Sequence, residues 1–227
     1  TPFGHSDWSK IVADVVAVGA DGKKVGVVST INGDANIGFY KELAAADVSA
    51  EKIPVVAFSV GEEELSGLDT SNLVGHLAAW NYFQSAESDI NSEFIKAWKT
   101  RMGKKRVTND PMEAHYIGFN MWVNAVKKAG TTEVDAVRTA MYGQKFPNLT
   151  GGMAEMLTNH HLSKPVLIGE IKADGQFDII SQTDPVPGDA WTDFLPESAV
   201  LKSDWKNLGC GMYNTKTKTC VQLKSNY

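Results

Sequence analysis

The sequence has only two cysteines among 227 residues, and no apolar run approaches the roughly 20 residues that a bilayer span requires. Positive charge is also scarce, because 22 Lys and Arg stand against 27 Asp and Glu and give a formal net charge of −5. A nucleic-acid-binding protein normally presents a basic face, so this balance argues against nucleic acid as a partner. The 43% of apolar residues suffices for one or two hydrophobic cores.

The common nucleotide and nucleophile motifs are missing too. The glycine-containing turn INGDAN, residues 31–36, fits neither nucleotide-binding fingerprint and lacks the GxSxG elbow of serine hydrolases. His160 and His161 are adjacent, and on an extended strand they would point to opposite sides, which is poor geometry for one metal ion. The sequence therefore favours a protein that is not an enzyme, and it implies no metal and no cofactor.

The two cysteines lie close together near the end of the chain. Nine residues, with Gly211 and Asn214 among them, separate Cys210 from Cys220. This spacing favours a hairpin closed by a disulfide, and hence an oxidising compartment. The alternative is a pair of unbonded thiols in a loop.

Helical and extended patterns alternate over the first part of the chain. Trp8 begins a helical pattern, and strands are predicted at 25–31, 53–60 and 75–83. The second of these is continuously apolar, as in strands that are buried on both faces of a parallel sheet. This alternation predicts an α/β fold built from βαβ units.

Three helices without intervening strands follow, between about residues 90 and 143. Asp110 is predicted as the N-cap of the second, followed by Pro111 at its first position. These helices should cover a sheet whose strands are not in this chain. Beyond them, residues 169–180 predict a hairpin with an Asp174-Gly175 turn, and the segment after Pro185 reads as an irregular wrap.

Polar and aromatic residues follow each of the three predicted strands. Open α/β sheets bind ligands at the carboxyl ends of their strands. In the first turn, Asp34 and Asn36 either cap the next helix or contact a ligand. Glu62 to Glu64 either offset a helix dipole or accept hydrogen bonds from an amine or amide. Strand alternation places Trp80 and Tyr82 on one side, so all three strands deliver such groups near one edge.

Six segments carry a resemblance to a known family: GHSDWSKIVADV, VVSTINGDANIGFYKEL, IPVVAFSVGEEEL, GHLAAWNYF, TNDPMEAHYIGFNMW and TNHHLSKPVLIGEIKADGQF. Between about Gly4 and Trp191 the chain resembles the urea-binding proteins of bacterial urea ABC transporters. These belong to the type I periplasmic binding proteins, together with the amide- and branched-chain amino-acid-binding proteins. The region after Trp191, with both cysteines, departs from the pattern.

The resemblance implies two Rossmann-like lobes with parallel sheets, joined by three crossover segments around a ligand cleft. This chain would cover roughly the C-terminal half. Residues 1–83 would form the first part of the C-terminal lobe, 84–148 helices of the N-terminal lobe, 149–190 the hinge return and hairpin, and 191–227 an irregular tail. It further implies a periplasmic location, or the outer face of the cytoplasmic membrane, and a membrane permease as partner.

The resemblance also implies a ligand, which is urea or a similar small amide. Urea offers N–H donors and one carbonyl acceptor, so a site needs acceptors such as Asn32 and Asp34, and a flat aromatic could stack on it. Amino-acid binders use an acid at the place of Glu62 or Glu63. Short amides, aliphatic amino acids, or a cytoplasmic amide-sensing regulator are the alternatives. The implied ligand-binding residues are Thr30, Asn32, Gly33, Asp34, Ala35, Ser59, Gly61, Glu62, Trp80 and Tyr82.

Overall fold

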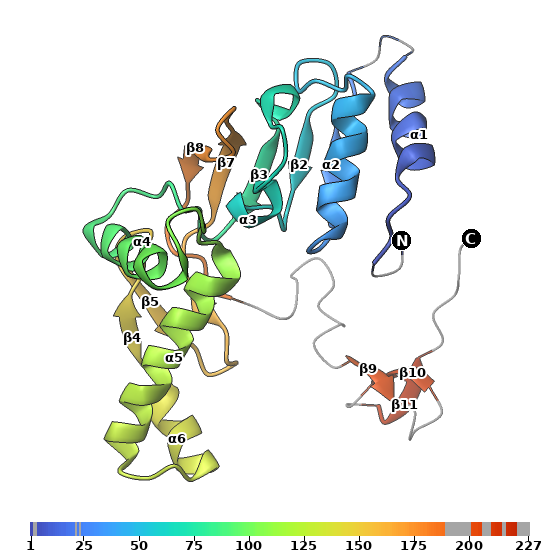
Figure 1. Cartoon of the computed structure of the whole chain (residues 1–227). Coiled ribbons are helices and arrows are strands. Elements are labelled where there is room, and N and C mark those ends of the chain that lie inside the picture. The colour runs from blue at the N-terminus through green and yellow to red at the C-terminus, as the bar shows by residue number, and fades with distance from the viewer. Residues whose placement is uncertain are drawn as a thin grey trace.

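The computed structural model describes residues 1, 4–20, 22, 24–188, 201–205, 210–214 and 217–221, and in 201–205, 210–214 and 220–221 it describes the backbone alone. Up to residue 188 these form two bodies, one around a five-stranded sheet and one mainly helical (Figure 1). None of the helices in these ranges has the length and apolar character needed to cross a bilayer.

The first body, called the sheet body, confirms the predicted α/β class. Its strands run in the order β1-β2-β3-β7-β8. The first three are parallel, and the predicted hairpin adds β7 antiparallel to β3 and β8 antiparallel to β7, so the sheet is mixed. The strand bounds are β1 (Val27–Ser29), β2 (Val55–Ala57), β3 (Leu77–Trp80), β7 (Leu167–Ile171) and β8 (Phe177–Gln182).

Helices on the sheet body bury its main core. Phe39 and Tyr40 of α2 are at most 2% exposed, and the ring of Phe83 stacks on that of Phe177 at 4.3 Å between centroids. β1 is the edge strand, and its Val28 is 71% exposed. The helical elements of this body are α1 (Ser9–Gly19), which precedes β1, and α2 (Ala35–Ala45), α3 (Glu62–Leu65) and the 3₁₀ turn η1 (Ser71–Leu73) between the strands.

The second body, called the helical body, corrects part of the expectation that the three helices cover a sheet whose strands are not in this chain. Its helices do find a sheet within this chain, because Ile117 and Met121 of α5 pack on Ala154 and Met156 of a small antiparallel sheet. The helix face with Phe119 and Trp122 stays exposed. The elements are α4 (Asp89–Met102), α5 (Asp110–Ala129), α6 (Val134–Met141), β4 (Lys145–Pro147), β5 (Met153–Met156) and β6 (Leu162–Ser163).

A third sheet lies in the tail and is described by its backbone. It consists of β9 (Leu201–Trp205), β10 (Cys210–Asn214) and β11 (Thr219–Val221) in the order β11-β10-β9. The predicted cysteine hairpin is β10 and β11, whereas β9 was not predicted. The side chains of Cys210 and Cys220 lie outside the described residues, so their disulfide stays a prediction.

Candidate ligand-binding edge of the sheet

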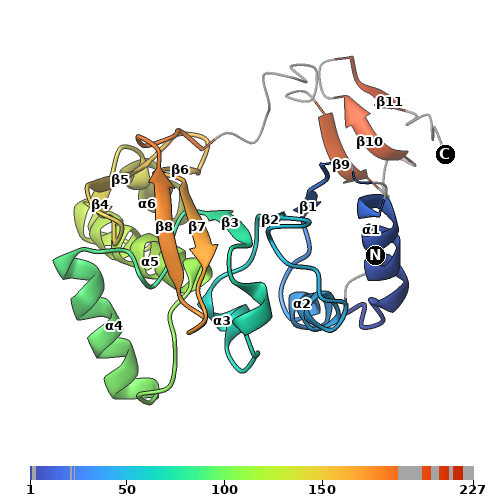
Figure 2. The same ribbon diagram turned by 90° about the horizontal axis from the view of Figure 1, so that it is seen from above.

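The three loops predicted to meet a ligand leave the sheet at the same edge. β1, β2 and β3 are parallel neighbours, and their pairing sets Ser29 beside Ala57 and Ala57 beside Ala78 (Figure 2). Their carboxyl ends are therefore level, and the chain leaves them as a first loop (30–34), a second loop (58–61) and a third loop from residue 81. This is the edge at which open α/β sheets bind ligands.

The first loop presents its polar side chains to the outside. Thr30, Asn32 and Asp34 are exposed, and Ala35 is partly buried at the start of α2. Asp34 takes the N-cap position of α2 without forming a side-chain cap hydrogen bond. Gly33 has a φ of +63°, a conformation that glycine adopts without strain. The capping alternative therefore does not account for the Asp34 carboxylate, which is left free.

Asn36 has a different role from the residues before it. Its side chain is 0% exposed, and its Nδ2 donates to the carbonyl oxygens of Ile31 at 2.9 Å and Ser59 at 3.2 Å. It thereby joins the first loop to the second. Asn36 is thus a positioning residue of this edge, and its burial does not fit direct ligand contact.

The second loop lies close to Trp80. A Cβ atom built on Gly61 would come within 3.3 Å of the Trp80 ring, so glycine permits this approach. The Gly61 backbone N–H donates to Oε2 of Glu64 at 2.9 Å, which fixes the start of α3. Ser59 and Trp80 are both partly buried. The second and third loops therefore meet through the Gly61–Trp80 contact.

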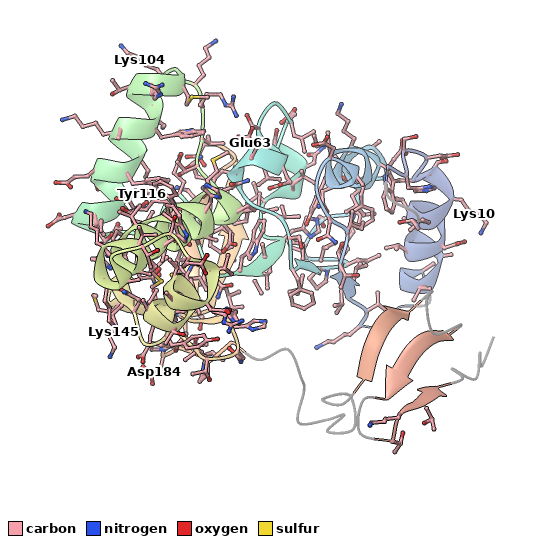
Figure 3. All side chains as sticks on the ribbon, turned by 90° about the horizontal axis from the view of Figure 1, so that it is seen from below. Lys10, Glu63, Lys104, Tyr116, Lys145 and Asp184 are labelled. Carbon is pink, nitrogen blue, oxygen red and sulfur yellow. The ribbon has the colours of Figure 1, made fainter. Side chains whose placement is uncertain are left out.

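Neither acidic candidate after the second strand, Glu62 or Glu63, has an unpaired carboxylate at the edge. Glu62 is 1% exposed, its Oε1 accepts the Gln84 N–H at 2.7 Å, and burial raises its pKa to about 8. Glu63 pairs instead with Arg106, with 3.1 Å between Oε1 and the guanidinium nitrogen. Figure 3 shows Glu63 on α3, at the boundary with the helical body. The structure does not bring either carboxylate to the exposed polar groups of the first loop.

Tyr82 is also placed differently from the prediction. It is 0% exposed, and its hydroxyl is hydrogen bonded to Asn91 Oδ1 at 2.8 Å and to Thr108 Oγ1 at 2.7 Å. The alternation used to pair it with Trp80 fails because β3 ends at Trp80. Burial raises the Tyr82 pKa, so the hydroxyl stays protonated. Direct ligand contact by Tyr82 is therefore not supported, whereas Trp80 keeps its place at the edge.

A hollow of about 410 Å³ adjoins the first loop. Thr30 and Asn32 line it on the loop side, and Ile11 of α1 lines it on the other, together with Trp8 at the N-cap of that helix. Thr30 and Asn32 of the first loop therefore border open volume.

The paired histidines each have a protein partner. His160 Nε2 lies 3.1 Å from the Tyr142 hydroxyl, and His161 Nδ1 lies 3.2 Å from the Asn159 carbonyl oxygen. Across the residues that the structure describes, no group of three or more His, Cys, Asp and Glu side chains is arranged to hold a metal ion.

Sequence reasoning missed a polar junction between the two bodies. Gln84 Oε1 accepts the Thr108 N–H at 2.9 Å, and Gln84 Nε2 donates to Gln176 Oε1 at 2.8 Å. Lys164, 6% exposed, pairs with the buried Glu113. The sequence signal for this junction was Lys164, a charged residue directly before Pro165 and an apolar strand.

The fold and the edge define the chain as an α/β protein with loops at the carboxyl ends of parallel strands. A model of the periplasmic binding protein domain matches residues 1–197. The chain belongs to the periplasmic binding protein family.

Solved structures share this fold. The solute-binding protein of an ABC transporter from Rhodopseudomonas palustris BisB5, in complex with 3,4-dihydroxybenzoic acid, has a TM-score of 0.69 at 18% identity, over 79% of this chain and 49% of that one. The substrate-binding protein of an amino acid ABC transporter from Pseudomonas fluorescens Pf-5 has a TM-score of 0.64 at 18% identity, over 82% and 50%. This chain thus spans about half the length of either protein.

A curated relative bears an enzyme name. It is a limonene hydroxylase from Geobacillus stearothermophilus, 33% identical over 134 residues, which are 58% of this chain and 24% of that protein. This chain therefore matches about a quarter of the relative. So short a match leaves most of the hydroxylase without a counterpart in this chain.

Proposed function

We propose that this chain carries one wall of the ligand cleft in the periplasmic solute-binding protein of an ABC importer. The ligand is urea or a similarly small amide, and the protein delivers it to a membrane permease. Closure of two lobes around the ligand would create the form that the permease recognises. In this proposal the protein binds its ligand and does not transform it.

The observation that carries the proposal is the set of exposed polar groups on the first loop. Thr30, Asn32 and Asp34 are all exposed at the carboxyl edge, and Asn36 holds their loop against the second one. Urea donates through its N–H groups, and the Asn32 and Asp34 side-chain oxygens are suitable acceptors. Each such group left unpaired in a closed cleft would cost about 1–3 kcal/mol, which favours a ligand that satisfies them.

The charge of this edge supports a neutral ligand over an anionic one. Residues 29–36, 59–64 and 80–81 contain four acidic residues and no lysine or arginine, and the exposed one among the four is Asp34. An aromatic acid such as the dihydroxybenzoate of the R. palustris neighbour would find no cation in these loops. A neutral amide would find acceptors there and a flat indole at Trp80.

An aliphatic amino acid is the second candidate. Its ammonium group would favour the exposed Asp34 carboxylate, since Glu62 and Glu63 have other partners. A cytoplasmic amide-sensing regulator is a third candidate, and a disulfide between Cys210 and Cys220 would favour the periplasmic protein over it.

Titration calorimetry on the protein with urea, acetamide, leucine and 4-hydroxybenzoate tests these alternatives. We expect binding heat with urea and weaker heat with acetamide, because the methyl group of acetamide replaces one NH2 group of urea and leaves its acceptors on the protein unpaired. Binding of leucine without any heat from urea would overturn the urea proposal. Binding of 4-hydroxybenzoate would contradict the charge argument.

A further inference from the structure

Three segments pass between the sheet body and the helical body in the described part of the chain. The first, residues 81–88, leads from β3 to α4. The second, 164–166, leads from β6 to β7, and the third, 183–188, returns from β8 to the side of β6 (Figure 1). Any rotation of one body against the other must bend these segments.

The second and third segments are bonded to each other through the backbone. Lys164 and Val186 exchange two hydrogen bonds, at 3.2 Å from the Lys164 nitrogen and at 2.8 Å from the Val186 nitrogen. The Thr183 N–H donates to the Val166 carbonyl oxygen at 2.9 Å. The two segments therefore form a short antiparallel pair.

Asn81 joins the first segment to the second. Its Nδ2 donates to the Pro165 carbonyl oxygen at 2.8 Å. Its backbone N–H donates to Oδ2 of Asp110 at 3.0 Å. Asp110 was predicted as the N-cap of α5, but Asn109 caps that helix by accepting the Met112 N–H at 3.3 Å. Asp110 is thus free to hold the connecting segment.

Lys164 joins the second segment to the same turn of α5. Its Nζ forms an ion pair with Oε2 of Glu113, and the two residues are 6% and 0% exposed. A buried ion pair of this kind fixes geometry, because removing one partner leaves the other charge uncompensated. The first turn of α5 thus holds the first segment through Asp110 and the second through Glu113.

We propose that Asn81, Asp110, Glu113 and Lys164 form a hinge clamp, which couples the three connecting segments and sets the angle between the two bodies. The segments then bend together and not independently. The consequence for ligand affinity rests on the proposed function, whereas the coupling of the segments does not.

The chain provides a matched control for the clamp. Arg106 and Glu63 form a second ion pair between the helical body and α3, but their side chains are 45% and 35% exposed. An exposed pair contributes little to stability, because solvent screens it. Arg106→Ala therefore removes an ion pair across the same junction without touching the clamp.

Hydrogen–deuterium exchange of the ligand-free protein tests the coupling. In Lys164→Met and in the isosteric Glu113→Gln, we expect amides of residues 81–88 to exchange roughly tenfold faster, although neither substitution lies in that segment. Amides of β2, at Val55–Ala57, should keep their rates, as should residues 81–88 in Arg106→Ala. Glu113→Gln preserves side-chain shape, so it reports on the clamp if Lys164→Met does not fold.

Three results would overturn the clamp. One is faster exchange limited to the neighbours of the substituted residue, and another is an equal acceleration in β2, which would mean a general loss of stability. The third is the same acceleration in Arg106→Ala. Urea calorimetry on Glu113→Gln then tests the consequence for ligand affinity. If the wild-type protein gives no heat with urea, the proposed ligand is wrong, but the exchange experiment still tests the clamp.

Discussion

The carboxyl edge of the sheet and the hinge clamp contain similar residues in opposite settings. At the edge, Asn32 and Asp34 are exposed, and within the described part of the chain their side chains form no hydrogen bond. In the clamp, Asn81 and Asp110 bond to each other and to neighbouring segments. The same amide and carboxylate groups are therefore available for the proposed binding where they are exposed, and they orient the connecting segments where they are paired.

The largest expected effect comes from breaking the buried ion pair of the hinge clamp. Lys164→Met leaves the Glu113 carboxylate buried without its cation, and we expect a loss of about 3–5 kcal/mol in the free energy of unfolding at pH 8. Burial raises the Glu113 pKa to about 7 even with Lys164 present, so a protonated Glu113 should soften the loss at pH 5. Unfolding in guanidinium chloride measures this loss of stability, and urea is avoided as the denaturant because it is the proposed ligand. A loss no larger than that of Arg106→Ala would contradict the expectation.

The next prediction concerns Asn36, a buried residue that supports the exposed edge. Asn36→Ala removes two hydrogen bonds and leaves two loop carbonyls unsatisfied, so we expect a loss of about 2 kcal/mol in the free energy of unfolding and weaker urea binding. Asn32→Ala is the control, because Asn32 is exposed in the same loop. Equal destabilisation by both substitutions would contradict the assignment of Asn36 as the positioning residue.

A third prediction uses pH. The folded protein holds the proton of Glu62 up to about pH 8, whereas the unfolded chain releases it near the usual value of 4.5. Between these values the folded state binds more protons, so raising the pH lowers the free energy of unfolding. Glu62→Gln should reduce this fall by about 2 kcal/mol between pH 5 and about pH 6.5. The exposed Glu51→Gln should leave the slope unchanged, and an unchanged slope in Glu62→Gln would refute the buried neutral carboxyl.

The sequence predicted the edge better than the clamp, for a physical reason. Alternating apolar segments fix the strands and their parallel order, and the polar loops follow from where the strands end. The clamp depends on residues far apart in the chain, 84 positions between Asn81 and Pro165 and 51 between Glu113 and Lys164. No local pattern records such pairs. Tyr82 and Glu62 were misplaced for a related reason, because burial by later segments at Gln84 and Thr108 decides their positions.

The smallest expected effect on stability is at Asp34, on the exposed carboxyl edge of the sheet. Asp34 is exposed and forms no capping hydrogen bond with α2, so Asp34→Ala should change the free energy of unfolding by less than about 0.5 kcal/mol. Its urea affinity should nevertheless fall roughly tenfold, because one acceptor for an N–H group is lost in the closed cleft.

Asp34→Asn separates charge from hydrogen bonding at the same position. An amide oxygen still accepts from urea, so Asp34→Asn should retain most of the affinity for a neutral ligand, whereas an amino acid would lose the partner of its ammonium group. Calorimetry with urea and leucine on both variants gives the answer. Unchanged urea affinity in Asp34→Ala would remove Asp34 from the site and leave Asn32 and Thr30 as the polar contacts of the first loop.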